Sequence, residues 1–275
     1  MKRVTIQGIK GCYHEVTANQ FFGKENISTI ECDTFRDVFF KVAEGEADFA
    51  IAAIENTIAG SLLQNYDLLN QSGLQIIGEY KQRISHCFAI HPEDNIEDLK
   101  EVWSHPIALM QCTDFLMKLP NPKVVEKCDT AWSAREIANN NLRGHAAICS
   151  KEAAEIYGLK VVENGIESNK HNFTRFLILS KSKTEQNQES KETNKASLAF
   201  SLPHTEGSLS QVLSILSFYG MNLSKIQSLP IIGREWEYLF YIDLCFSDIT
   251  RYYQSIDAIK PLTKDFISFG EYKEA

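Results

Sequence analysis

The segment TFRDVFFKVAEGEADFAIAAI, residues 34–54, carries the pattern that decides the fold class of this chain. Thr34 and Asp37 form a capping box ahead of a helical run of apolar side chains, and Gly45 can end that helix. Residues 49–54 are all apolar, which is typical of a strand buried on both faces. The segment therefore predicts a strand-helix-strand unit with a buried parallel strand, as in α/β proteins.

The same alternation extends over the region before residue 181. Helical patterns separate further apolar runs that predict strands. These runs lie at 87–90, 101–103, 123–125, 146–149 and 173–179. We therefore expect an α/β fold throughout this region.

A change in composition marks the end of the α/β region. Residues 181–195 contain no apolar side chain, so burial cannot offset the entropy of ordering them, and we expect a linker. After it, residues 196–202 predict a strand and 207–219 a helix with one apolar face. Two more strands, a helix at about 249–264 and a strand near 267–269 complete a β-α-β-β-α-β order, the ferredoxin-like plan.

Length and charge narrow the classes of protein to consider. The 275 residues predict two domains, which we place at 1–180 and 196–275. The net charge of −8 argues against nucleic acid or an anionic membrane as a partner. The chain starts with a strand-like segment rather than a secretory signal, and no apolar run approaches the length of a membrane helix.

The seven cysteines are scattered and contain no C-x-x-C pair. Such spacing argues against a disulfide framework and against a zinc site. We expect reduced thiols in a cytoplasmic protein.

A glycine-containing turn from Gly8 to Tyr13 lies between a predicted strand and a predicted helix. Its backbone amides can face an anion at the helix N-terminus. Two glycines after a strand also commonly make only a turn, so this motif alone does not identify a ligand site.

The segment from Ile54 to Ser61 places Glu55, Asn56 and Thr57 directly after the buried strand. Open α/β sheets bind ligands at the carboxyl ends of their strands, which makes these residues candidates. The alternative is that Thr57 caps the next helix while Glu55 and Asn56 satisfy loop backbone groups.

Two further polar groups follow predicted strands. Ser104-His105-Pro106 precedes a helical stretch that contains Gln111, and Ser104 can act there simply as the helix N-cap. The chain has no G-x-S-x-G elbow, so a serine hydrolase is excluded. Thr130 likewise lies where a strand gives way to a helix.

Thr174 and Arg175 begin the strand predicted at 173–179, so their side chains should point to opposite faces. Taken alone, a β-forming threonine beside a surface charge is the simpler interpretation of this pair.

Taken together, these blocks resemble the prephenate dehydratase family along nearly the whole chain. The family's G-x-x-G-[ST]-[YF], I-E-N-[ST]-x-x-G, S-H-P-x-x-x-x-Q-C and T-R-F motifs match residues 8–13, 54–60, 104–112 and 174–176. The chain departs from the family pattern at three positions. Cys12 stands where the family usually has serine or threonine, His14 where it often has serine, and Ile107 where it often has glutamine.

The resemblance implies a carbon-oxygen lyase that needs no metal or organic cofactor. It would remove carbon dioxide and water from prephenate and leave phenylpyruvate, a step of L-phenylalanine biosynthesis. Thr174 would donate a hydrogen bond to the departing hydroxyl, with Glu55 orienting it. The substrate carboxylates and keto group would be held by Asn56, Ser104, Gln111 and Thr130. Further substrate contacts are expected from Thr57, Arg175, Phe176, Gly11 and Tyr13.

The family also implies a catalytic region with two lobes, like periplasmic binding proteins, and the substrate between them. We expect lobe I at about 1–80 and 165–180, and lobe II at about 81–164. Closure of the lobes would exclude water from the reaction.

The C-terminal domain resembles the ACT family, which binds amino acids at subunit interfaces. Residues 207–209 match its G-A-L turn, and 222–230 match the dehydratase motif N-L-T-K-I-E-S-R-P, with Gln227 and Leu229 replacing two charged residues. Feedback by L-phenylalanine is expected, in a homodimer or homotetramer; an ACT domain that only dimerises the enzyme is the alternative. The expected phenylalanine contacts are Gly207, Ser208, Leu209, Asn222, Leu223, Gln227, Ser228 and Pro230.

Two other functions stay open at this point. Arogenate dehydratase carries out the same chemistry on a substrate with an amino group in place of the keto oxygen, and a two-lobed protein can also be a non-catalytic solute-binding sensor. Because the catalytic pattern begins at Val4, we expect no mutase fused in front of it.

Overall fold

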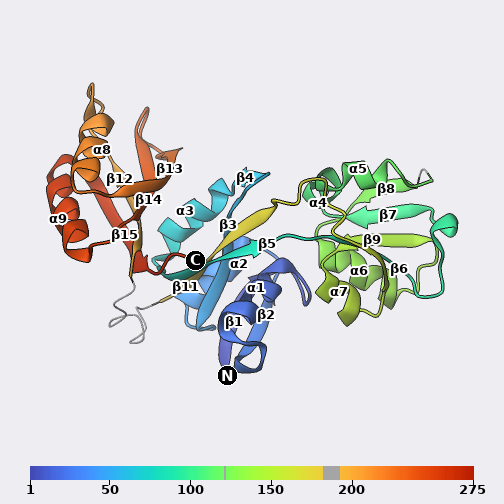
Figure 1. Cartoon of the computed structure of the whole chain (residues 1–275). Coiled ribbons are helices and arrows are strands. Elements are labelled where there is room, and N and C mark those ends of the chain that lie inside the picture. The colour runs from blue at the N-terminus through green and yellow to red at the C-terminus, as the bar shows by residue number, and fades with distance from the viewer. Residues whose placement is uncertain (121, 182–192) are drawn as a thin grey trace. The chain divides into compact units, whose positions relative to one another are not determined.

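The computed structural model describes residues 1–120, 122–181 and 193–275 (Figure 1). The chain divides into two compact units. The first consists of Met1–Leu68 and Tyr80–Phe176, and the second of Leu69–Glu79 and Leu177–Ala275. This division differs from the predicted boundary at residue 180, because the second unit also takes in residues 69–79 and 177–180.

The first sheet has the strand order β2-β1-β3-β11-β5, with the short strand β4 paired to β3. Its strands are β1 (Lys2–Gln7), β2 (Ile27–Cys32), β3 (Phe49–Asn56), β4 (Gly60–Ser61), β5 (Gln75–Arg83) and β11 (Phe173–Ser180). The helical segments along this part of the chain are α1 (Tyr13–Phe22), η1 (Lys24–Asn26), α2 (Phe35–Ala43) and α3 (Leu63–Ser72).

The segment 34–54 forms the predicted unit. Thr34 caps α2, since its Oγ1 accepts a hydrogen bond from the Asp37 backbone N–H at 3.2 Å. Gly45 follows the helix with φ of 88°, a conformation that glycine adopts without strain. β3 then runs parallel to β1 and is buried over residues 49–54. The carboxyl end of this central strand delivers Asn56 to the site described below.

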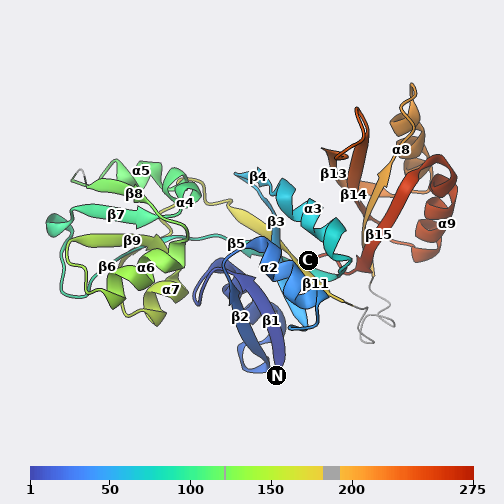
Figure 2. The same cartoon turned by 180° about the vertical axis from the view of Figure 1, so that it is seen from behind.

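The second sheet of the first unit has the order β10-β6-β9-β7-β8. Its strands are β6 (Cys87–Ile90), β7 (Glu101–Ser104), β8 (Lys123–Glu126), β9 (His145–Cys149) and β10 (Lys160–Asn164). Figures 1 and 2 show α4 and α5 on one face of this sheet and α6 and α7 on the other. The helical segments are η2 (Ile96–Asp98), α4 (Pro106–Gln111), α5 (Thr113–Leu116), α6 (Thr130–Asn139) and α7 (Lys151–Ile156).

The C-terminal sheet, in the second unit, has the order β13-β14-β12-β15, which confirms the predicted ferredoxin-like plan. Both of its helices pack on one face, where Val212, Leu216 and Ile256 join the core (Figure 2). The elements are β12 (Lys195–Ser201), α8 (Ser208–Phe218), β13 (Asn222–Pro230), β14 (Tyr238–Cys245), α9 (Ile249–Ile259), η4 (Lys260–Leu262) and β15 (Lys264–Tyr272).

Two predicted boundaries in this region are wrong. The helix expected to reach Lys264 ends at Ile259, because Pro261 follows in a 3-10 turn and has no backbone N–H to continue the α-helix. Lys195 was assigned to the linker but is the first residue of β12, with its side chain buried. Linker residues 182–192 lie outside the described part of the chain.

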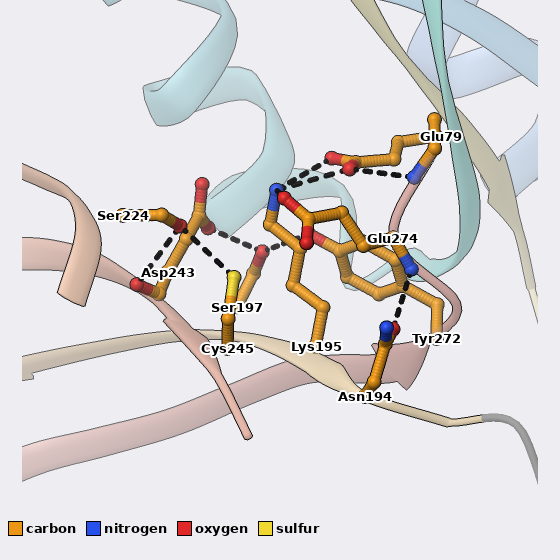
Figure 3. A network of polar contacts seen from close by, with 10 residues as sticks. Glu79, Asn194, Lys195, Ser197, Ser224, Asp243, Cys245, Tyr272 and Glu274 are labelled. Atoms are coloured by element: carbon orange, nitrogen blue, oxygen red, sulfur yellow. Dashed lines mark hydrogen bonds and ion pairs between the residues drawn. The ribbon is translucent and has the colours of Figure 1, made fainter. Parts of the chain in front are cut away.

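Lys195 is buried because it has charged partners. Its Nζ lies 3.0 and 3.1 Å from the two carboxylate oxygens of Glu79 and 3.7 Å from Oε1 of Glu274 (Figure 3). Beside it, Ser197 Oγ donates to Asp243 Oδ1 at 2.5 Å and lies 2.7 Å from Tyr272 Oη. A buried charge is tolerated only when paired and hydrogen-bonded, and here both conditions hold.

None of the helices in residues 1–120, 122–181 and 193–275 has the length and apolar character needed to cross a membrane. All seven cysteines lie in the described part of the chain and are free thiols, although the Sγ atoms of Cys87 and Cys149 approach to 3.9 Å.

Candidate active site

A cavity of about 400 Å³ lies in the first unit and takes residues from β3 and β11, from α1, α4 and α6, and from the loop residue His105 after β7. Its volume is within the range of small-molecule sites, and its wall combines apolar side chains with polar groups, as such sites usually do. The polar side chains that line it are Tyr13, His14, Asn56, Ser61, His86, His105, Gln111, Asp129, Thr130 and Thr174.

Six of the predicted site residues meet at this cavity, and the others do not. Those that line it are Tyr13, Asn56, Gln111, Thr130, Thr174 and Phe176. Those that do not line it are Gly11, Glu55, Thr57, Ser104 and Arg175.

Asn56 and Thr174 are joined by a hydrogen bond whose direction is set by the backbone. Asn56 Oδ1 accepts from the N–H groups of Ile58 and Ala59 at 2.9 and 2.8 Å, so its Nδ2 must face the other way. Nδ2 then donates to Thr174 Oγ1 at 3.0 Å. Because the Thr174 oxygen accepts this bond, its own proton remains for a ligand in the cavity.

The side-chain amide of Gln111 has its oxygen occupied within the protein. Its Oε1 accepts from Asn172 Nδ2 at 2.9 Å and lies 3.0 Å from His86 Nε2. The Gln111 Nε2 group, with two N–H donors, is therefore available to an acceptor in the cavity.

Thr130 enters the cavity wall as the first residue of α6. The preceding residue, Asp129, caps this helix by accepting from the Trp132 N–H at 2.8 Å. Burial raises the pKa of the Asp129 carboxyl above its usual value.

Ser104 lies outside the cavity wall because its hydroxyl has another partner. It is fully buried, and its Oγ donates to the Ile148 carbonyl at 2.5 Å. It is not the helix N-cap either, since His105 holds that position and its Nδ1 accepts from the Ile107 N–H. The Ser104 hydroxyl therefore ties β7 to β9.

Two backbone amides in the turn from Gly8 to Tyr13 already have partners within the protein. The N–H groups of Lys10 and Gly11 donate to the carboxylates of Glu31 and Glu15 at 2.9 and 2.6 Å, which leaves them unavailable to a ligand. Gly11 has a packing role instead. A Cβ there would stand 2.6 Å from the Cα of Ala153, at φ of +85°.

Strand alternation explains why Arg175 and Glu55 do not line the cavity, and a loop contact explains Thr57. Thr174 and Phe176 line the cavity while Arg175 between them does not, which confirms that 174 and 175 point to opposite faces. Glu55 precedes Asn56 on β3 and likewise misses the cavity. Thr57 follows the strand, and its Oγ1 donates to the His171 carbonyl at 3.0 Å, a loop contact.

The sequence prediction missed the histidines and Asn172. His14 packs against Phe176 with ring centroids 5.0 Å apart, and burial lowers the pKa of His14 to about 3. Its Nε2 is buried and has no hydrogen-bond partner among the described residues. The departure of His14 from the family pattern was the available signal, and Asn172 lies two positions before the T-R-F block.

The predicted phenylalanine contacts separate into two groups. Gly207, Ser208 and Leu209 line a hollow on the second unit at the start of α8. The other predicted residues belong to β13, the edge strand of the sheet, and do not line this hollow. They are Asn222, Leu223, Gln227, Ser228 and Pro230.

The fold and the site define a class of protein. Its members have an α/β region of two sheets that holds a small-molecule site, followed by a ferredoxin-like domain. Residues 4–184 match the sequence profile of the family described as prephenate dehydratase. The chain belongs to the prephenate dehydratase family.

Known relatives agree with this family. The chain is 37% identical over 253 residues to "Arogenate dehydratase/prephenate dehydratase 2, chloroplastic" of Arabidopsis thaliana, covering 88% of this chain and 64% of that protein. The prephenate dehydratase of Arthrobacter aurescens, solved in complex with L-Phe, is similar with a TM-score of 0.89 and 26% identity, covering 98% of this chain and 90% of that one. A structure described as GqqA, a novel type of quorum quenching acylase, is similar with a TM-score of 0.90 and 25% identity, covering 100% and 98%.

Proposed function

We propose that this protein is a prephenate dehydratase, which converts prephenate to phenylpyruvate, carbon dioxide and water in L-phenylalanine biosynthesis. The observation that carries the proposal is the pairing of Asn56 with Thr174, which leaves the threonine proton for an acceptor in the cavity. A departing hydroxyl needs such a donor.

The reaction needs little beyond orientation and this donor. As the bond between the ring and its carboxylate breaks, its electron pair completes the aromatic ring, and the bond to the ring hydroxyl breaks. The departing oxygen takes up one proton, which the solvent supplies in net terms, and leaves as water. Aromatisation supplies the driving force. Thr174 is a poor acid in isolation, so we assign it the role of a positioned donor to the departing oxygen.

The rest of the cavity suits a substrate that loses a carboxylate. Gln111 and Thr130 supply uncharged donors for the carboxylates and the keto group. Among the described residues that line the cavity, none is lysine or arginine. A carboxylate held by neutral donors among apolar side chains has lost most of its hydration, and loss of carbon dioxide disperses its charge.

Regulation by L-phenylalanine is the second part of the proposal. The second unit has the ferredoxin-like plan of ACT domains, and the hollow beside Gly207, Ser208 and Leu209 is the proposed site. A similar dehydratase has been solved with L-Phe, which supports this ligand. Residues of β13 would complete the site from a second copy of the chain, at a subunit interface.

The edge strand β13 supports assembly into a homodimer or homotetramer. Unpaired strand edges usually need protection, and apolar side chains are exposed on β13 and beyond it. Ile226 is 42% exposed, Ile232 93% and Trp236 74%. Pairing through β13 would cover this edge. We place the enzyme in the cytoplasm, where free thiols persist.

Three alternatives are less well supported. Arogenate dehydratase differs only in the substrate's amino group, and the plant relative carries both names. A solute-binding sensor would not need the proton that Thr174 offers. An acylase needs a hydroxyl activated by a base, whereas the Thr174 oxygen accepts from the Asn56 amide.

The test is phenylpyruvate formation by the purified protein given prephenate or arogenate, with and without L-phenylalanine. Thr174→Ala should lower kcat by about 100-fold or more, while the control Thr113→Ala, at an exposed helix position, should leave it unchanged. Turnover of arogenate alone would replace the substrate in the proposal. Binding of prephenate without product would indicate a sensor.

A further inference from the structure

We propose that His86 is a positioning residue that fixes the direction of the Gln111 amide and so sets which group Gln111 offers to the substrate. The inference rests on the proposed function and deepens it. His86 lies at the start of the second lobe, just before β6, and its side chain is 3% exposed.

The side-chain amides of Asn56, Asn172 and Gln111 form a row, and backbone N–H groups fix the orientation of the first of them, Asn56. Asn56 Oδ1 takes the N–H groups of Ile58 and Ala59, which have no alternative orientation. Asn56 Nδ2 therefore faces Asn172, and the oxygen of Asn172 must meet it at 2.8 Å. This contact leaves Asn172 Nδ2 facing Gln111.

The orientation of Asn172 in turn fixes the orientation of Gln111 and the protonation of His86. An N–H of Asn172 requires an oxygen at Gln111, so Oε1 occupies the position between Asn172 and His86. That oxygen in turn requires a proton on His86 Nε2, 3.0 Å away. The tautomer of His86 thus follows from two backbone N–H groups in the loop after β3.

The other side of the ring is consistent with this tautomer. His86 Nδ1 lies 3.1 Å from Tyr13 Oη, whose single proton faces two acceptors, this nitrogen and the Ser85 carbonyl at 2.9 Å. Burial lowers the pKa of His86, which favours the neutral ring, and its backbone N–H donates to Glu167 Oε2 at 3.0 Å. Tyr13 and Gln111 therefore contact the ring from its two nitrogens, and the Glu167 carboxylate holds the backbone of His86.

The two donors on Gln111 Oε1 act as a clamp. If the amide turned over, its NH2 group would face the N–H groups of His86 and Asn172, and its oxygen would face the cavity. An oxygen there repels a substrate carboxylate, whereas Nε2 attracts it. With only one of the two donors left, the amide is less strongly held, and part of the population presents the wrong atom.

Two amides of different length at position 86 separate this role from a packing role. In His86→Gln, an N–H can take the place of Nε2 and still reach Gln111. In His86→Asn the shorter side chain can replace only the Nδ1 side. We expect His86→Asn to raise KM for prephenate roughly tenfold with kcat within about twofold, and His86→Gln to return KM to within about threefold of the wild type.

A double-mutant cycle tests the route of the effect. In a Gln111→Ala background, His86→Asn should change KM no further, because the amide on which it acts is gone. If the asparagine variant does not fold, His86→Leu, which also lacks the donor, takes its place in the cycle. Equal effects of His86→Asn with and without Gln111, or equal KM values for the Asn and Gln variants, would overturn the inference.

The proposed function can fail separately. If the wild type neither turns over prephenate nor binds it in calorimetry, the proposed function fails and the inference fails with it. If the wild type turns over prephenate and His86→Asn leaves KM unchanged, only the role of His86 is wrong.

Discussion

The two buried polar networks of this protein use opposite means to satisfy their groups. In the second unit, Lys195 lies between the carboxylates of Glu79 and Glu274, and the Glu79 and Lys195 side chains are 0% and 3% exposed. In the first unit, the chain from His86 through Gln111 to Asn56 and Thr174 consists of neutral side chains. Glu167 touches that chain only through a backbone N–H.

This difference suggests a division of labour. A buried ion pair is strongly destabilising when one partner is lost, so its partners must remain fixed on each other. A chain of amides and hydroxyls has more donors and acceptors than its own bonds consume, and the remaining ones can face a ligand. The charged network therefore serves stability, whereas the neutral network can serve binding and chemistry.

Breaking the charged network should have the largest effect on stability. Lys195→Met removes the cation and leaves the Glu79 carboxylate buried, so the free energy of unfolding should fall by about 3–5 kcal/mol. Urea unfolding measures this loss. The double variant Lys195→Met with Glu79→Leu removes both charges and should regain much of it. A single variant no less stable than the double one would contradict the argument.

Placing a charge in the neutral network should damage turnover instead. In Asn56→Asp, an oxygen replaces Nδ2 and can only accept, so the Thr174 hydroxyl would turn its proton toward residue 56 and away from the cavity. We expect kcat to fall about 100-fold, the usual effect of losing one aligned donor. Steady-state kinetics with prephenate measure it, and Asn139→Asp, at an exposed position on α6, is the control. An unchanged kcat would show that Asn56 does not aim this proton.

Lowering the pH should reduce the stability of the protein, because His14 is buried beside the neutral network in its uncharged form. Burial lowers the pKa of His14 to about 3, below the usual 6.5, so the unfolded chain binds a proton between these values and the folded one does not. Stability is therefore retained above pH 6.5 and lost as the pH falls below it. Between pH 7 and 4.5 the loss from His14 should be about 2–3 kcal/mol.

His14→Phe is the variant that checks this loss. Phenylalanine keeps the contacts with Phe35 and Phe176 and cannot be protonated. The difference in unfolding free energy between pH 7 and 4.5 should shrink by about 2–3 kcal/mol, measured by urea unfolding at both values. If the variant is as acid-sensitive as the wild type, another group carries the effect.

The sequence was sufficient to predict the elements of the fold but only part of the site. The capping box at Thr34 and the apolar run at 49–54 are local features, and both appear as expected. The partner of a polar side chain depends on distant segments. Ser104 bonds to Ile148, 44 positions away, and His86 contacts Gln111, 25 positions away. No pattern in the sequence identifies such pairs.

The misplaced Lys195 has the same origin. A lysine after a polar run is typical of a linker, and only the carboxylate of Glu79, 116 positions earlier, explains why it is buried in a strand. Likewise, Glu15 and Glu31 occupy two amides of the glycine turn that was considered as an anion site. In both cases a charged group from elsewhere in the fold decided the outcome.

The smallest predicted effect concerns Ser197 and Asp243, which lie beside the Lys195 ion pair and which we count with the charged network, and it tests whether this network has any part in catalysis. Ser197 is 5% exposed and donates to Asp243 at 2.5 Å, so Ser197→Ala removes one hydrogen bond to a carboxylate. The free energy of unfolding should fall by about 1–2 kcal/mol, against no change for Ser247→Ala at an exposed position. Because this network serves stability, kcat for prephenate should stay within about twofold of the wild type. A fall in kcat without a loss of stability would mean that the charged network also acts on the active site, and the division of labour between the two networks would be wrong.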